Sequence, residues 1–162
     1  MDEIIFRTIR PMNRLILELM ASGRMRIGEV LKLTRGDIED RKLKLRSPKS
    51  GKKRETVFIP QKIADRLKEY ITRKGIRSDQ RIFPISYTAG REVMNKAGKV
   101  VGIRLKPHDL RRHAATYASR SGMPIEIVSK VIVWHANLST TQRYLGTVSD
   151  VEAIRWIDNL YG

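Results

Sequence analysis

The amino-acid sequence predicts a mostly helical domain with one small antiparallel β-sheet, an α+β fold. Three observations support this prediction. Apolar residues recur at helical spacing through most of the chain. One stretch alternates polar and apolar residues as a strand does, and a second strand-like run follows it after a polar turn. Two segments near the C-terminus open with Ser followed three residues later by Gln or Glu, a pattern that begins helices.

The N-terminal half is expected to hold three helices. In the first, Ile16 and Leu19 recur at helical spacing, and Gly23 is a typical residue after a helix end. The third opens at Pro60, whose fixed φ suits a first helical turn. The expected bounds are 10–22, 27–33 and 60–74, with a turn at 34–37.

A β-hairpin with a basic tip is predicted between the second and third helices. Residues 42–46 alternate polar and apolar side chains, and 55–59 form the returning strand that Pro60 stops. The connecting residues 47–53 combine Pro, Ser and Gly with three lysines, which is turn chemistry.

The C-terminal half is expected to be helical over 88–98, 109–120 and 124–133, with a connector at 77–83. Two more helices begin at Ser139 and Ser149, each opening a capping box. The last helix carries an apolar stripe with nothing after it in the sequence to pack against: Val151, Ile154, Ile157, Leu160 and Tyr161. This stripe either folds back onto its own domain or docks into a neighbouring subunit, and the sequence leaves both readings open.

Composition bounds the function. Of 162 residues, 41% are hydrophobic and 31% charged, which fits one globular domain that buries a real core. Lys and Arg number 33 against 17 Asp and Glu, a net charge of +16 that favours a polyanionic partner such as nucleic acid. No membrane-length apolar run or secretion signal is present in the sequence. The absence of Cys excludes disulfides and thiolate metal sites, and it is compatible with a cytoplasmic setting.

The strongest motif is C-terminal. His108 and Arg111 form a His-x-x-Arg box, His135 follows about two dozen residues later, and Tyr144 comes nine residues after His135. In this order and spacing the sequence resembles the tyrosine recombinases, the phage integrase family. The resemblance covers about residues 12–147 and implies the integrase catalytic core fold.

Two upstream segments extend the resemblance. Residues 23–31 resemble the family's first-arginine box, and the helix start that follows selects Arg26 over Arg24, with Glu29 in a supporting role. Lys49 stands at the hairpin tip where the family carries its catalytic lysine, and Lys52 is the nearest substitute. Each position alone is weak evidence, whereas the ordered set of six is highly specific.

The resemblance implies cleavage and rejoining of DNA through a 3′-phosphotyrosine, with Tyr144 as nucleophile. Arg26 and Arg111 would fork onto the nonbridging phosphate oxygens, which planar guanidinium groups do better than lysine. His108 would orient or accept a proton, Lys49 would protonate the leaving 5′ oxygen, and His135 would hydrogen-bond the phosphate. No metal and no cofactor are expected, because arginines neutralise the charge and the covalent bond conserves the energy.

Further implications concern partners. Double-stranded DNA is the expected partner, and similar enzymes self-associate on DNA in a tetrameric synapse through the C-terminal helix. We expect a prokaryotic, phage or mobile-element origin and a cytoplasmic, nucleoid-associated location. Cationic residues near the boxes are candidate DNA contacts: Arg24, Lys52, Lys53, Arg54, Arg112 and Arg143.

Two departures from the family pattern keep alternatives open. Trp134 stands where Gly is usual before the His of the third box, and it could compete with His135. We expect residues 1–162 to be a single catalytic domain, without the N-terminal core-binding domain usual in the family. A non-catalytic integrase-like DNA-binding protein and a type IB topoisomerase-like enzyme are the competing hypotheses.

Overall fold

The computed structural model confirms the predicted fold class. It describes residues 2–46, 54–107, 109–110, 113, 121–124, 127 and 150–161. The described elements in chain order are α1 (Asp2–Arg7), α2 (Pro11–Ser22), α3 (Ile27–Lys32), the 3-10 helix η1 (Arg35–Asp37), β1 (Ile38–Glu39), β2 (Lys42–Arg46), β3 (Arg54–Phe58), α4 (Gln61–Lys74), α5 (Tyr87–Val100) and α9 (Asp150–Tyr161).

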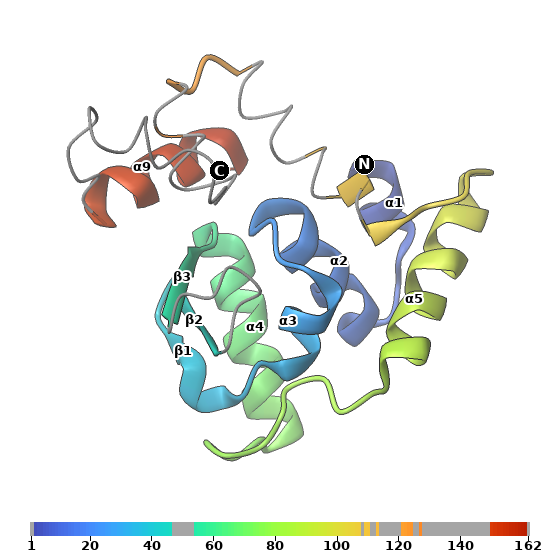
Figure 1. The fold of residues 1–162 in the computed structure, drawn as a ribbon, viewed down its shortest axis with the longest axis horizontal. Helices are drawn as coiled ribbons and strands as arrows, with labels where there is room; N and C mark the ends of the chain where they lie inside the picture. Colours follow the sequence, from blue (N-terminus) through green and yellow to red (C-terminus); the bar gives the residue numbers. More distant parts are fainter. Residues whose placement is uncertain are drawn as a thin grey trace.

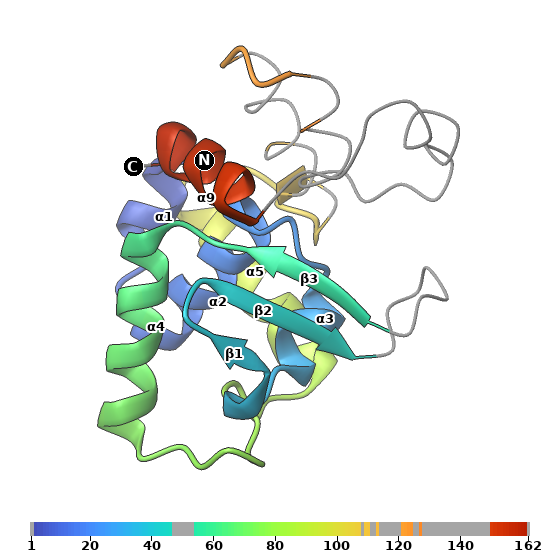
Figure 2. The same cartoon turned by 90° about the vertical axis from the view of Figure 1, so that its left-hand side faces the viewer.

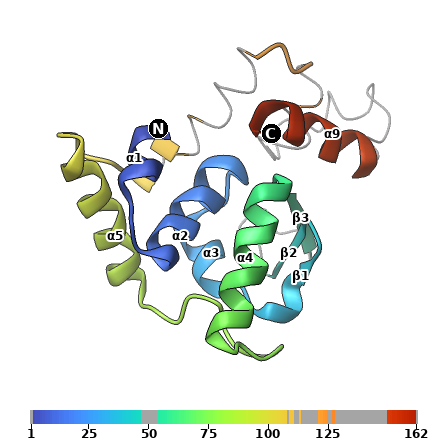
Figure 3. The ribbon, with the colours of Figure 1, turned by 180° about the vertical axis from the view of Figure 1, so that it is seen from behind.

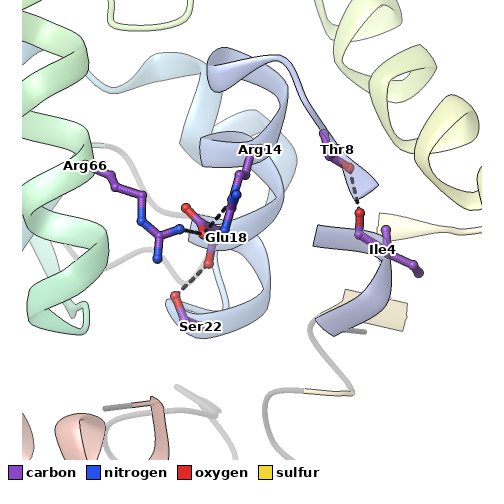
Figure 4. A network of polar contacts seen from close by, with 6 residues as sticks. All are labelled: Ile4, Thr8, Arg14, Glu18, Ser22 and Arg66. Carbon is purple, nitrogen blue, oxygen red and sulfur yellow. Dashed lines mark hydrogen bonds and ion pairs between the residues drawn. The ribbon is translucent and has the colours of Figure 1, made fainter. Parts of the chain in front are cut away.

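Helix α2 is the centre of the molecule. Its residues Leu15–Ser22 are all buried. It lies between α4 on one side and the adjacent pair α1 and α5 on the other (Figure 1), an arrangement also seen from behind (Figure 3). Polar contacts reinforce the α2–α4 contact, because the buried Glu18 on α2 pairs with Arg66 on α4 and with Arg14 one turn earlier (Figure 4). The apolar residues of α2 therefore form the middle of the main core.

The sheet has three antiparallel strands in the order β1-β2-β3. Leu43 pairs with Val57 and Arg46 with Arg54, so residues 47–53 connect the strands beyond the Arg46–Arg54 end. Leu43, Leu45 and Val57 are buried and share one face, as the alternation predicts. The sheet thus lays an apolar face on the main core (Figure 2).

Helix α3 brings α5 close to the core. Gly90 on α5 permits this approach, because a Cβ there would lie 3.0 Å from both Ile27 Cδ1 and Leu31 Cδ1. The connector before α5 is tied to the end of α3, where Arg81 Nε donates to the Leu31 carbonyl at 2.7 Å. These contacts fix α5 beside the segment that carries Arg26.

Helix α9 packs onto its own chain. It lies beyond the β3 edge of the sheet (Figure 2), and its buried Ala153, Ile157 and Leu160 join Phe58, Met123 and Ile127 in a second apolar cluster. Arg41, in the β1–β2 turn, is 6% exposed and pairs with Asp158 on α9 at 2.5 Å. Of the two readings left open by the sequence, the structure has the one in which the stripe folds back.

Most element predictions are confirmed within one or two residues, and two elements were missed. The second strand begins at Arg54 and ends at Phe58, one residue before the predicted span, and α5 is longer than 88–98. The missed elements are α1 and β1, which are six and two residues long and too short to show a period. The predicted helices 109–120 and 124–133 and the one from Ser139 lie mostly outside the described residues.

Candidate active site

Of the six candidate catalytic residues, Arg26 alone lies in the part of the chain that the structure describes. It stands immediately before α3 in extended conformation, with φ −73° and ψ 148°. Its backbone N–H donates to Glu29 Oε2 at 2.8 Å, and its carbonyl accepts the Val30 N–H at 3.0 Å. The neighbours Met25 and Ile27 are 0% and 3% exposed. Hydrogen bonds and buried neighbours thus hold the backbone from which this half-buried arginine projects.

A tight turn delivers the chain from α2 to Arg26. A Cβ on Gly23 would lie 2.8 Å from the Leu19 carbonyl oxygen and 3.0 Å from Val57 Cγ1, so the turn packs closely against β3. Arg24 follows with φ 53°, the left-handed region that costs a residue with a side chain about 1–3 kcal/mol. Such strain persists where surrounding contacts determine the conformation, and here it lies two residues before a candidate catalytic arginine. Arg24, a predicted DNA contact, is half-buried.

The supporting prediction for Glu29 has a specific geometric basis. Glu29 is the third residue of α3, and its carboxylate accepts the N–H of the residue that precedes the helix. This is the acidic half of a capping box, which satisfies one of the orphan donors at a helix start. Glu29 therefore holds the backbone at Arg26.

The segment before His108 is anchored in the same way. The Lys106 N–H donates to Asp109 Oδ2 at 2.8 Å, while the Asp109 N–H donates to the Lys106 carbonyl at 3.0 Å. Leu110 is 0% exposed and belongs to the main core. Hydrogen bonds and burial thus hold the described residues that flank position 108 in the sequence.

Most of the other predicted site residues lie outside the described residues. Lys49, Lys52 and Lys53 fall in the hairpin connection, and Arg54 begins β3 opposite Arg46. The remaining ones are His108, Arg111, Arg112, Trp134, His135, Arg143 and Tyr144.

A basic groove beside α5 was missed by the sequence prediction. It encloses about 810 Å³ between α5 and residues 102–107, and its described lining includes Pro107, the residue before His108 in the sequence. Four exposed cations line it: Arg91, Lys99, Arg104 and Lys106. None of these side chains makes a hydrogen bond or ion pair to another described residue. The sequence did hold a signal, because Tyr87, Arg91, Asn95 and Lys99 recur every fourth residue and so share one face of α5.

The described residues contain no cluster of three His, Cys, Asp or Glu side chains that would suit a metal ion. Within the same described part, no helix combines the length and the apolar character that a membrane crossing needs.

Comparisons with known proteins agree with this arrangement. The sequence matches the Phage integrase family over residues 3–149. It is 30% identical over 157 residues to the tyrosine recombinase XerA of Saccharolobus solfataricus, covering 93% of this chain and 53% of that protein. The chain thus spans about half the length of the curated relatives it matches.

Solved structures show the same fold. The crystal structure of XerA recombinase is similar with a TM-score of 0.72 at 24% identity, covering 99% of this chain and 62% of that one. The Tn1549 transposon integrase, solved in complex with transposon right end DNA, is similar with a TM-score of 0.67 at 13% identity, covering 99% and 64%.

Proposed function

Because this chain belongs to the phage integrase family, we propose that it is the catalytic domain of a site-specific DNA recombinase. It cleaves and rejoins DNA strands by transesterification. Tyr144 is the nucleophile, and the intermediate is a 3′-phosphotyrosine. Residues 1–162 act as a single catalytic domain on double-stranded DNA.

One observation carries this proposal. The family match over residues 3–149 includes all six candidate positions in the family's order: Arg26, Lys49, His108, Arg111, His135 and Tyr144. The described residues support the proposal, because helix-start hydrogen bonds hold the backbone at Arg26 and the segment before His108.

The proposed reaction balances without an added reactant. The Tyr144 oxygen forms a bond to phosphorus as the bond from phosphorus to the 5′ oxygen breaks. His108 takes the phenolic proton, and Lys49 gives a proton to the departing 5′ oxygen. Arg26, Arg111 and His135 stabilise the extra negative charge on the nonbridging oxygens, and loss of one such donor typically costs about 3–4 kcal/mol of transition-state energy. Attack by a 5′-hydroxyl on the phosphotyrosine rejoins the strand.

The groove beside α5 supports DNA as the substrate. Four cationic side chains of its lining have no ion-pair partner among the described residues: Arg91, Lys99, Arg104 and Lys106. Each phosphate contact releases condensed counterions, so affinity falls steeply with salt. We expect Lys99→Ala to weaken binding to all duplexes alike and to lower the slope of log affinity against log salt by about 1. An unchanged slope would remove this groove from the interface.

We also propose self-association on DNA through α9, as a tetrameric synapse. In the structure α9 lies against its own chain, where Arg41 binds Asp158 and the Ile154 carbonyl. Docking of α9 into a neighbouring subunit would require these contacts to be exchanged for equivalent ones. Crosslinking with and without DNA tests this step, and a monomer under both conditions contradicts it.

The central experiment traps the covalent intermediate. Because the target site is unknown, the substrate is a pool of duplexes with randomised sequence and one nick, so that the short 3′ piece diffuses away after cleavage. We expect a protein–DNA adduct that survives denaturation and is absent in Tyr144→Phe. Tyr161→Phe is the matched control, because it removes another phenolic hydroxyl, one that donates to the Ala21 carbonyl at 3.4 Å. Sequencing the trapped DNA then reveals the site.

The outcomes separate the competing functions. No adduct at high protein concentration, despite DNA binding, would make the chain a non-catalytic binding protein. An adduct with relaxation of supercoiled DNA and no strand exchange would indicate a topoisomerase-like enzyme.

A further inference from the structure

A second groove lies at the opposite end of α2 from Arg26. It encloses about 470 Å³ between the first turn of α2 and the last turns of α4. Its lining residues are Arg10, Pro11, Met12, Asn13, Tyr70, Arg73 and Lys74. Helix α2 has 12 residues, so about 18 Å of helix separates this groove from the turn that leads to Arg26. The groove is therefore distinct from the end of α2 that leads to Arg26.

The start of α2 has no internal cap. Arg10 precedes it in extended conformation and offers no side-chain acceptor, and the first turn contains no acidic residue. Pro11 has no N–H, while Met12 and Asn13 carry donors that no residue within the helix can satisfy. The positive end of the helix dipole thus faces the groove without a compensating negative group.

Three exposed cations surround this helix start. Arg10, Arg73 and Lys74 all line the groove, and none makes a hydrogen bond or ion pair to another described residue. None of the described residues that line the groove is acidic. The local charge is therefore positive from both the backbone and the side chains.

Tyr70 supplies an independent observation. It is 5% exposed, and its ring packs on Phe83 with 6.0 Å between centroids. Its hydroxyl has no hydrogen-bond partner among the described residues, although the residue lines the groove. Burial raises its pKa, and the charge of Arg73 partly offsets this, so the Arg73 guanidinium lies near the phenol. The hydroxyl is thus a donor without a protein partner among the described residues, and the groove that Tyr70 lines is the place from which an acceptor would come.

We propose that this groove binds a phosphate group. The free backbone N–H groups at the start of α2 and the Tyr70 hydroxyl donate to its oxygens, and Arg10, Arg73 and Lys74 neutralise its charge. Phosphate suits this site better than a carboxylate, because it offers more acceptor oxygens to donors that converge from two helices. The volume leaves room for a group attached to the phosphate over the apolar surfaces of Pro11, Met12 and the Tyr70 ring.

The test is a titration of the full chain with inorganic phosphate, followed by amide chemical shifts. We expect saturable shifts at the first turn of α2. Tyr70→Phe should weaken binding about 2–10-fold, the usual contribution of one hydrogen bond. The same variant should leave the urea midpoint unchanged, because the lost hydroxyl has no protein partner among the described residues. A purely structural tyrosine would show the reverse pattern.

A charge-matched pair controls for net charge. Lys74→Ala and Lys62→Ala each remove one exposed lysine from α4, but Lys62 lies at the other end of the helix, outside the groove. We expect Lys74→Ala to weaken phosphate binding several-fold and Lys62→Ala to leave it unchanged. Shifts that grow linearly up to tens of millimolar phosphate, or equal weakening by both variants, would overturn the proposal.

A second arm identifies the source of the phosphate. If a random duplex displaces inorganic phosphate, and Lys74→Ala weakens duplex binding more than Lys62→Ala does, the group belongs to DNA. If the duplex leaves the shifts at α2 in place, the group belongs to a free phosphate compound. Both results support a phosphate site. Neither depends on the Tyr144 adduct, so this proposal and the recombinase proposal can fail separately.

Discussion

Removal of Arg66 should destabilise the protein more than removal of the Glu18 carboxylate that it neutralises. The Glu18 side chain is 5% exposed, and its charge is met by Arg66 and by Arg14 Nε at 3.3 Å (Figure 4). Its Oε2 atom has no hydrogen-bond partner. The two arginines are 35% and 37% exposed, so water reaches the cations but not the anion. Removal of the buried carboxylate and removal of a partly exposed arginine should therefore differ in their effect on stability.

The magnitudes follow from this asymmetry. Breaking a buried pair costs about 3–5 kcal/mol when one charge is left uncompensated, and Arg14 still compensates part of it. We therefore expect Arg66→Ala to lower the free energy of unfolding by about 2–3 kcal/mol. Glu18→Met removes the buried charge and keeps an apolar side chain of similar size, while the arginines stay hydrated. Its cost should lie within about 1 kcal/mol, and it could stabilise the protein.

Urea unfolding measures both effects, since a change of midpoint at constant slope reports stability. The double variant Arg66→Ala with Glu18→Met completes the cycle, and it should be about as stable as Glu18→Met alone. A Glu18→Met variant less stable than Arg66→Ala would refute the reasoning. It would mean that the pair attracts more than burial of the carboxylate costs.

Three further predictions concern Arg26, α9 and alkaline pH. Glu29→Ala should lower the free energy of unfolding by about 1 kcal/mol through loss of the 2.8 Å hydrogen bond from the Arg26 N–H. The same variant should slow adduct formation more than it weakens DNA binding. An equal effect on both would show that Glu29 does not position Arg26. Asp158→Ala leaves the 6%-exposed Arg41 without its carboxylate, so we expect the free energy of unfolding to fall by about 3 kcal/mol and proteolysis at α9 to begin earlier. Arg41→Met should lower the free energy of unfolding less. The opposite order of the two variants in urea unfolding would contradict this. Burial raises the Tyr70 pKa above 10.0 in the folded state, so the folded protein holds the phenolic proton more tightly than the unfolded chain does. The protonated phenol therefore contributes its full share of stability below pH 10, and that contribution is lost as the pH rises through the folded pKa. Tyr70→Phe should flatten that alkaline loss in urea titrations, and an unchanged profile would assign it to other groups.

Local patterns in the sequence predicted the elements that their own residues stabilise. The alternation at 42–46 gave β2 without error, because Leu43 and Leu45 on one face are buried by the core. The stripe of α4 was found for the same reason. Helix α1 gave no comparable signal, since Ile4 is buried while Phe6 is 79% exposed. It is defined by its contacts with α2 and α5, which no local pattern encodes.

Long-range choices could not be predicted. The apolar stripe of α9 is visible in the sequence, but its partner is not. The contacts that seat α9 come from Arg41, which is 117 residues from Asp158 in the chain. One arginine among many in a chain of net charge +16 carries no mark of this pairing. The groove beside α5 was missed for a similar reason. Its second wall is formed by residues 102–107, and the sequence does not show that these residues lie against α5.

The local chemistry that positions the candidate site is ordinary helix capping. Before α3, η1 and the segment that contains Leu110, the N–H of the preceding residue is accepted by an acid three residues later: Glu29, Asp37 and Asp109. Two of these three helix starts belong to boxes predicted to carry catalytic residues. A capping bond fixes the direction in which the chain enters a helix, so residues on either side of the start inherit a defined position. Arg26 is itself such a residue, and position 108 lies between Lys106 and Asp109. These boxes are recognisable in the sequence from the order and spacing of their His and Arg residues, whereas the capping hydrogen bonds can be assigned only from the structure.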